Sequence, residues 1–231
     1  MKIGIMQPYF FPYIGYWQLL AYVDRYVVYD DVNFIKRGWI NRNNILLNGE
    51  GYMLTLPLDR ASQNKKINEI VLVSDPAVRA KVVKTLELAY RRAPKYETIM
   101  PQIRSLIINA GGIAELNIQS IRWVCNYLEL NTEILVSSQL EKSNELKGQD
   151  KIIDIVQRLH GDVYVNAIGG KELYDKDVFQ ELGITLHFLS MGEFSYNQFG
   201  KTFIPGLSII DALMFCERGE IRDYLNCFTI E

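Results

Sequence analysis

The sequence predicts an α/β protein with a parallel-sheet, nucleotide-binding-like core, and residues 1–231 form a single expected domain. Residues 3–6 read as a short apolar strand that passes through one turn into a helix beginning near Trp17. The same alternation of short apolar strands and amphipathic helices returns after residue 131. Short strand-turn-helix units of this kind place successive strands parallel in one sheet.

Composition narrows the class of protein. The chain is 48% hydrophobic and 23% charged, which is ordinary for a globular protein. Its net charge of −2 is spread without long runs of one sign, so we expect no nucleic-acid partner. The apolar runs are too short for a membrane span or a signal peptide. The three cysteines lack metal-ligand spacing, so we expect no metal site. With the short apolar runs, this composition predicts a cytoplasmic protein without membrane insertion.

The first third of the chain continues the strand pattern. Residues 26–29 read as a second strand that ends at Asp30 and Asp31. Residues 44–47 and 52–56 read as two strands of a hairpin, because the Asn-Gly-Glu-Gly run between them supplies residues that tolerate positive φ. Residues 67–73 alternate well enough to predict one more strand.

The middle of the chain changes to helical spacing. Asp75 followed by Pro76 predicts a capped helix that runs to about Arg92. Pro94 and Pro101 are expected to interrupt the chain before helical spacing resumes at 103–109, and residues 113–130 predict a further helix. We therefore expect residues 75–130 to form a helical insertion, which fits either a lid or a homodimer interface.

The last third predicts strands at 132–136, 162–165 and 184–189, with a helix at 149–160. Ser208 is expected to cap a further helix, and Asp211 then lies near the positive end of that helix. The two histidines, His160 and His187, fit a helix end and a packed strand. A Ser-His-Asp hydrolase is therefore a poor fit.

The aromatic turn after the first strand is the first candidate site, with Gln7, Tyr9, Tyr13 and Tyr16 as candidate substrate-binding residues. Turns at the ends of sheet strands are where α/β proteins bind nucleotides and small molecules. The spacing Tyr-Ile-Gly-Tyr matches the His-x-Gly-His motif of nucleotidyltransferases, with both histidines replaced. Tyrosine hydroxyls can donate to phosphate but are uncharged at neutral pH. Simple packing of the helix on the sheet explains the aromatics equally well.

The segment 30–43 is the second candidate site. Its basic residues Arg37 and Arg42 lie among Trp39, Asn41 and Asn43, which are residue types that bind phosphates and stack on rings. We interpret this segment as an anion-binding site, against the alternative of a solvated loop. Its candidate catalytic residues are Asp30, Asp31 and Lys36. Either aspartate would serve as a base or a Mg²⁺ ligand, against the alternative of turn caps, and strand geometry lets at most one face the site.

Two later loops also follow predicted strands. The first contains the candidate binding residues Lys142 and Asn144. The second contains Asn166, Gly169 and Gly170, where paired glycines let backbone N–H groups approach a ligand closely. Two such loops from neighbouring strands favour a shared ligand site more strongly than either loop alone.

Six sequence runs together give the chain a resemblance to the WbqC-like family: residues 7–16, 29–32, 35–43, 147–150, 166–170 and 207–214. The resemblance spans nearly the whole chain, and it implies a setting in bacterial O-antigen and other surface-glycan biosynthesis. A fainter similarity to pantothenate synthetase, which joins a carboxylate to an amine, covers only residues 7–16 and the strand after them. The two missing histidines argue against adenylation.

The family resemblance and the anion-binding segment together predict amide formation on the amino group of a nucleotide-linked sugar. Either ATP with Mg²⁺ or an acyl-CoA would activate the acyl or aminoacyl donor. Two alternatives stay open: a non-catalytic module that binds or scaffolds sugar nucleotides, and a glycosyltransferase that uses the same ligand.

Overall fold

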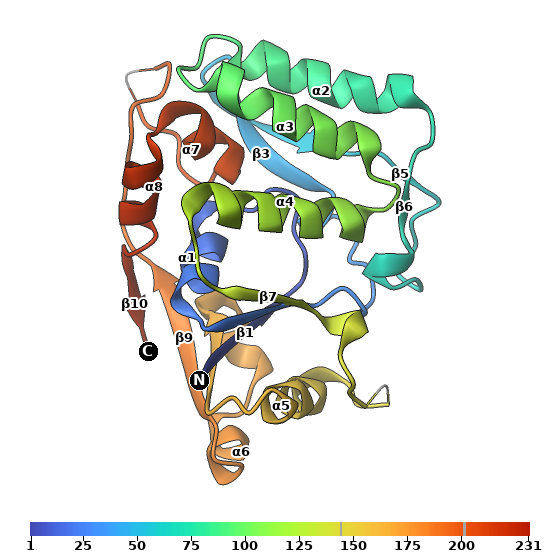
Figure 1. The fold of residues 1–231 in the computed structure, drawn as a ribbon, viewed down its shortest axis with the longest axis vertical. Coiled ribbons are helices and arrows are strands. Elements are labelled where there is room, and N and C mark those ends of the chain that lie inside the picture. The colour runs from blue at the N-terminus through green and yellow to red at the C-terminus, as the bar shows by residue number, and fades with distance from the viewer. Residues whose placement is uncertain (144, 201) are drawn as a thin grey trace.

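The computed structural model describes residues 1–143, 145–200 and 202–231. Its centre is a six-stranded sheet with the order β10-β9-β8-β1-β2-β7 (Figure 1). All neighbouring strands are parallel except β10, which runs antiparallel along the edge beside β9. The strands are β1 (Lys2–Met6), β2 (Arg25–Val28), β7 (Glu133–Val136), β8 (Val163–Ala167), β9 (Thr185–Met191) and β10 (Phe228–Ile230). The mostly parallel sheet confirms the predicted α/β class.

Helices cover both faces of the sheet, as Figure 1 shows. On one face, Ile3, Ile5 and Val27 join a core with α5 (Gly148–Arg158) and α6 (Lys176–Glu181). On the other face lies α1 (Ile14–Tyr22), and helices α2 (Pro76–Tyr90), α3 (Tyr96–Asn109) and α4 (Ile113–Leu128) extend the same core away from the sheet. The alternation of side chains along each strand thus feeds two separate cores.

The remaining elements pack around the helical side. The hairpin β3 (Arg42–Leu47) and β4 (Glu50–Thr55) turns at Asn48 and Gly49, which both have positive φ (55° and 83°). Its position and turn are as the sequence predicts. The other elements are the strands β5 (Leu58–Asp59) and β6 (Val71–Leu72), the 3₁₀ turns η1 (Ile67–Glu69), η2 (Ser137–Gln139) and η3 (Ile168–Leu173), and the helices α7 (Ile209–Phe215) and α8 (Arg218–Tyr224).

Two expectations from the sequence are wrong in detail, and three elements have no counterpart in the sequence prediction. The helix α3 does not break at Pro101 but runs through it, because its buried Ile99, Met100 and Ile103 pack into the core and offset the one lost backbone hydrogen bond. The expected strand at 67–73 is mostly the η1 turn, with only the two residues of β6 paired. The elements α6, α8 and β10 were not expected at all, because each is short and carries little periodic signal.

Ser208 and Asp211 show how the last helix is fixed. The Ser208 hydroxyl accepts from the N–H of Ile210 at 3.2 Å, which confirms the predicted cap. Asp211 is fully buried and does more than face the helix end, since it accepts hydrogen bonds from Tyr90 and Tyr196 at 3.0 and 2.8 Å. The helix is thereby tied to α2 and to the long segment that follows β9.

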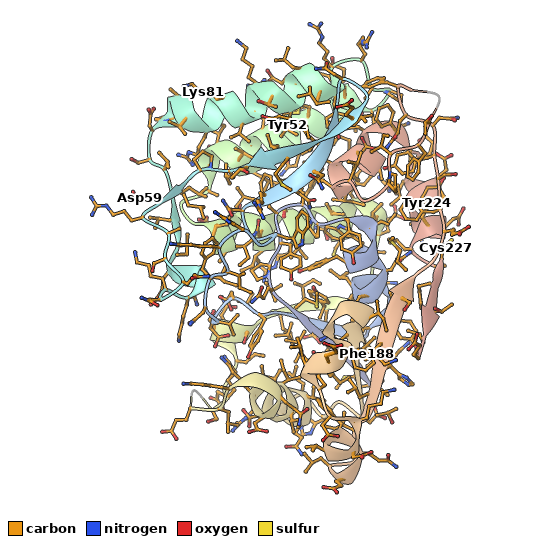
Figure 2. The ribbon with its side chains drawn as sticks, turned by 180° about the vertical axis from the view of Figure 1, so that it is seen from behind. Tyr52, Asp59, Lys81, Phe188, Tyr224 and Cys227 are labelled. Carbon is orange, nitrogen blue, oxygen red and sulfur yellow. The ribbon has the colours of Figure 1, made fainter. Side chains whose placement is uncertain are left out.

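Figure 2 shows how labelled side chains of the interior and of the surface lie. Phe188 lies inside between the sheet and α6, whereas Asp59 and Lys81 project from the margin. Across the described residues, none of the helices combines the length and the apolarity that crossing a membrane requires.

Candidate functional site

The strand order creates a natural ligand position between β1 and β8. The chain leaves β1 through α1 toward β2 on one side, and it leaves β8 through α6 toward β9 on the other. In open α/β sheets the crevice at such a reversal, outside the carboxyl ends of the strands, is the usual binding site. A pocket of about 750 Å³ lies here.

The pocket is aromatic and uncharged. Its wall contains five tyrosines: three come from the turn and helix after β1, one directly follows β2, and one directly follows η3 (Tyr9, Tyr13, Tyr16, Tyr29 and Tyr174). Apolar residues from β1, α1, α5, η3 and β9 complete the wall. Among the described residues, no charged side chain contributes to its lining. The lining residues are Ile5, Met6, Gln7, Tyr9, Tyr13, Gly15, Tyr16, Leu19, Tyr29, Ile35, Trp39, Ile152, Asn166, Ala167, Ile168, Gly169, Gly170, Leu173, Tyr174, Leu189, Ser190 and Met191.

Side chains from distant elements hold the aromatic turn that forms one wall. The Asn43 amide on β3 donates to the carbonyls of Phe10 and Phe11 at 3.1 and 2.9 Å. The Asn117 amide on α4 donates to the carbonyls of Pro8 and Ile40, both at 2.9 Å. Phe11 itself has φ of 41°, an uncommon value for a residue with a side chain. The turn is therefore imposed by the surrounding structure.

The tyrosines of this turn present neutral hydroxyls. Tyr9 and Tyr16 pack with ring centroids 5.6 Å apart, and the Tyr16 hydroxyl donates to the Gln7 carbonyl at 3.1 Å. Burial raises the pKa of the Tyr9 and Tyr13 hydroxyls above the ordinary tyrosine value. At neutral pH they can therefore donate or accept hydrogen bonds but cannot act as charged bases.

The packing around Gly15 explains why the Tyr-Ile-Gly-Tyr run has a glycine at this position. A Cβ at this position would lie 2.5 Å from the ring of Tyr13, so the ring rests directly on the glycine backbone. The glycine thus sets the position of a half-exposed tyrosine at the mouth of the pocket.

We predict that Gly15→Ala moves the Tyr13 ring and weakens ligand binding, while the melting temperature changes little because the ring end can swing into solvent. Isothermal titration and a thermal melt would measure the two effects. Gly219→Ala is the matched control, since its Cβ would meet no atom within 4 Å and the residue lies outside the pocket lining. An equal loss of affinity in both variants would contradict a positioning role for Gly15.

The glycine loop after β8 lies on the opposite side of the pocket. Asn166 is buried, donates to the Tyr164 hydroxyl at 3.0 Å and accepts from the N–H of Ala167 at 2.7 Å. A Cβ on Gly170 would lie 3.0 Å from the Asn166 amide, so this glycine permits the close fit. The structure therefore brings Asn166, Gly169 and Gly170 together with Gln7 and the turn tyrosines around one pocket.

Asp30 lies outside the pocket lining and supports the loop after β7. Its carboxylate accepts from the N–H and the hydroxyl of Ser138 at 2.9 and 2.7 Å, and from the Asn68 amide at 3.3 Å. It is only 2% exposed. These contacts favour the turn-cap interpretation of this residue over a catalytic base.

Asp31 forms a buried ionic cluster with two lysines. Its Oδ2 lies 3.1 Å from the ammonium of Lys142 and 3.0 Å from that of Lys151. Burial alone would raise the pKa of Asp31, but the Ser137 hydroxyl and the two ammonium groups outweigh it and lower the pKa to about 2. Neither Asp31 nor Lys142 belongs to the pocket lining.

The two aspartates do not provide a fitting Mg²⁺ site. Mg²⁺ is normally held by one or two free carboxylates together with substrate phosphates. Here the Asp30 carboxylate is occupied by three hydrogen bonds, and the Asp31 carboxylate faces two cations. In the described residues no three acidic, histidine or cysteine side chains gather as metal ligands would. The arrangement therefore does not fit ATP with Mg²⁺ at this edge.

The basic segment divides into structural and exposed residues. Arg42 donates to the carbonyls of Gly38, at 3.0 Å, and Arg37, so it holds the turn at 35–38. The Asn41 amide donates to the Leu56 carbonyl at 2.9 Å. By contrast, the side chains of Lys36 and Arg37 are exposed at the tip of this turn, whose flanking residues Ile35 and Trp39 line the pocket. They form no ion pair with any described residue.

The predicted residues thus separate into three groups. Gln7, Tyr9, Tyr13, Tyr16, Trp39, Asn166, Gly169 and Gly170 line the pocket; Lys36 and Arg37 lie beside it; and Asp30, Asp31, Asn41, Arg42, Asn43 and Lys142 hold loops in place. Asn144 lies outside the described residues. Tyr29 and Ser190, which the sequence analysis missed, lie at or beside strand ends and were identifiable by that position. Asn117 gave no signal, since nothing local marks its distant partners.

Comparisons with known proteins show the family of the chain. Residues 7–223 match the model of the WbqC-like protein family. The chain is also similar to the uncharacterized protein Rv1507c of Mycobacterium tuberculosis, with 27% identity over 229 residues that cover 97% of each chain. The family match begins at Gln7, directly after β1, and includes every other strand and loop that contributes to the pocket. The chain therefore belongs to the WbqC-like protein family.

Proposed function

We propose that the protein binds a nucleotide-linked amino sugar in the pocket between β1 and β8 and acylates the sugar's amino group during the assembly of bacterial surface glycans. One observation carries the proposal: an uncharged, tyrosine-rich pocket at the sheet's switch point has two exposed cations, Lys36 and Arg37, beside its mouth. Aromatic rings suit a base or a sugar ring, and the cations suit a diphosphate. The glycan setting comes from the family resemblance.

The pocket offers chemistry based on positioning. In the proposed step the sugar nitrogen attacks the carbonyl carbon of an acyl thioester, the C–N bond forms, the C–S bond breaks, and the thiol leaves with the proton lost by the amine. The Gln7 amide and the neutral Tyr9 hydroxyl make no hydrogen bond to another described residue, so both are available to orient the acceptor. Holding two reactants in contact is itself a large part of such catalysis.

We expect the double variant Lys36→Ala with Arg37→Ala to lose tenfold or more in affinity for a nucleotide-linked amino sugar at low salt, because each charge-assisted phosphate contact contributes about 1.5–3 kcal/mol. Isothermal titration against a panel of such sugars measures this loss. Lys81→Ala with Lys84→Ala removes the same charge from the exposed face of α2, which contributes nothing to the pocket, and is the matched control. Equal affinity in the two double variants would refute the phosphate assignment.

A second candidate function is a non-catalytic sugar-nucleotide-binding module. The observation that favours it is that Asp30 and Asp31 are occupied by structural contacts, so the described lining holds no charged general base. Mass spectrometry distinguishes the two functions after incubation with sugar nucleotide and acyl thioester. A product heavier by the acyl group supports the transferase, and tight binding without any product supports the module.

A further inference from the structure

Exposed apolar side chains gather at the mouth of the pocket. Of the thirteen large hydrophobic residues that are exposed in the described chain, six line this one pocket. We call these six the apolar rim: Tyr13, Ile35, Trp39, Ile168, Leu173 and Met191. Scattered exposed apolar residues need no explanation, but a cluster around a cavity marks a surface that a ligand covers.

The rim is more strongly apolar on the side of β8 and β9. There Ile168, Leu173 and Met191 are 37%, 70% and 43% exposed. The lining also contains the apolar residues Ile152, Ala167 and Leu189. The two exposed cations, Lys36 and Arg37, lie outside the lining, between Ile35 and Trp39 in the sequence, on the side of the turn that follows β1. The pocket thus has an aliphatic side and a side adjacent to positive charge.

This division constrains the acyl donor. An acetyl or formyl group is too short to cover the exposed side chains of η3 and the end of β9. An aminoacyl donor would bring a charged amine to a wall where the described lining offers no carboxylate. An aliphatic chain of several carbons would bury the exposed apolar surface and gain affinity with each methylene.

We propose that the pocket takes, as its second ligand, a phosphopantetheine thioester of an aliphatic acyl chain, with the chain along Ile168, Leu173 and Met191. The inference rests on the proposed function for the role of this ligand as acyl donor. The phosphate of the pantetheine arm is common to free coenzyme A and to a carrier protein, and either source supplies the same chemistry.

The test measures binding without turnover. Isothermal titration of the full chain with coenzyme A thioesters of two, four, eight and twelve carbons should show affinity rising about three- to fourfold per added methylene until the aliphatic wall is covered. Leu173→Ser should flatten this dependence. Leu173 is 70% exposed, so the variant should fold normally. Leu182→Ser, at a residue 47% exposed and outside the pocket, is the matched control.

Three outcomes would overturn the inference. Affinity could be independent of chain length, Leu173→Ser could behave like Leu182→Ser, or Leu173→Ser could reduce binding to anionic lipid vesicles while thioester affinity stays unchanged. The last result would make the apolar rim a membrane contact. Comparing octanoyl-coenzyme A with an octanoylated acidic carrier protein identifies the source of the thioester.

The sugar titration separates this inference from the proposed function. If a nucleotide-linked amino sugar binds but thioester affinity ignores chain length, only the inference about the donor fails. If thioesters bind with the expected chain-length dependence and no sugar nucleotide binds, the proposed acceptor is wrong, whereas the apolar ligand class of the pocket stands.

Discussion

Replacing Asp31 with alanine should lower the free energy of unfolding by about 3–5 kcal/mol, the cost of leaving buried charges without their partner. The side chains of Asp31, Lys142 and Lys151 are 5%, 3% and 8% exposed, and both ammonium groups lie about 3 Å from one carboxylate oxygen. Removing that carboxylate leaves two nearly buried ammonium groups without their shared anionic partner. Urea unfolding monitored by circular dichroism would measure the loss.

A surface ion pair supplies the control for Asp31. Glu133 pairs with Arg25 at 2.6 Å but is half exposed, so Glu133→Ala should cost less than about 1 kcal/mol. Adding Lys142→Met and Lys151→Met to Asp31→Ala should recover most of the loss, because apolar groups of similar volume replace a buried ion cluster well. If Asp31→Ala costs no more than Glu133→Ala, the cluster contributes little to stability.

The same cluster should make the protein sensitive to acid. The pKa of Asp31 is lowered in the folded chain from 3.8 to about 2. A carboxyl with a depressed folded pKa stabilises the fold above its unfolded pKa, and this contribution is lost as the pH falls from about 4 to about 2. Asp31→Asn, which does not titrate, should lack this part of the pH dependence in unfolding curves measured across that range.

The features that sequence predicts best are those fixed within a few residues. The strand at the N-terminus, the turn after it and the following helix form a contiguous unit, and the turn residues Tyr9, Tyr13 and Tyr16 do line the pocket. The glycine loop after β8 is predictable for the same reason, because it follows a strand end directly. Parallel strands bring such turns to one edge of the sheet whatever the chain does between them.

The sequence does not show which polar side chains hydrogen-bond to the backbone of the protein itself. Arg42, Asn41 and Asn43 carry the functional groups of an anion site, but their hydrogen bonds go to backbone carbonyls, in the case of Asn43 to residues more than thirty positions away. An amide that holds a loop and an amide that binds a phosphate look identical in sequence. Only the tertiary fold shows which backbone groups lack other donors.

Asn43→Ala should destabilise the protein by about 2–4 kcal/mol, because each buried polar group left without a partner costs about 1–3 kcal/mol. The Phe10 carbonyl would lose its Asn43 donor, and the N–H of Asn44 would lose the Asn43 oxygen that it contacts at 2.9 Å. The Phe11 carbonyl keeps a second donor in the Ser208 hydroxyl at 2.6 Å. Urea unfolding with and without a bound ligand would measure the loss and any weaker binding that follows from it.

Trp39→Ala gives the contrast that assigns these two residues different roles. Trp39 is 42% exposed and its backbone carbonyl, which accepts from Phe10 at 2.9 Å, is unaffected by the change. Its stability loss should stay below about 1 kcal/mol, while removal of a ring that stacks on a base should cost about 1–3 kcal/mol of binding. Asn43→Asp tests further whether the Asn43 amide holds the turn, since a carboxylate would face the two carbonyls to which the amide now donates. The opposite result would be that Asn43→Ala abolishes binding without loss of stability, while Trp39→Ala lowers stability without loss of binding. In that case Asn43 on β3 would be a ligand contact, and the aromatic turn would only support it.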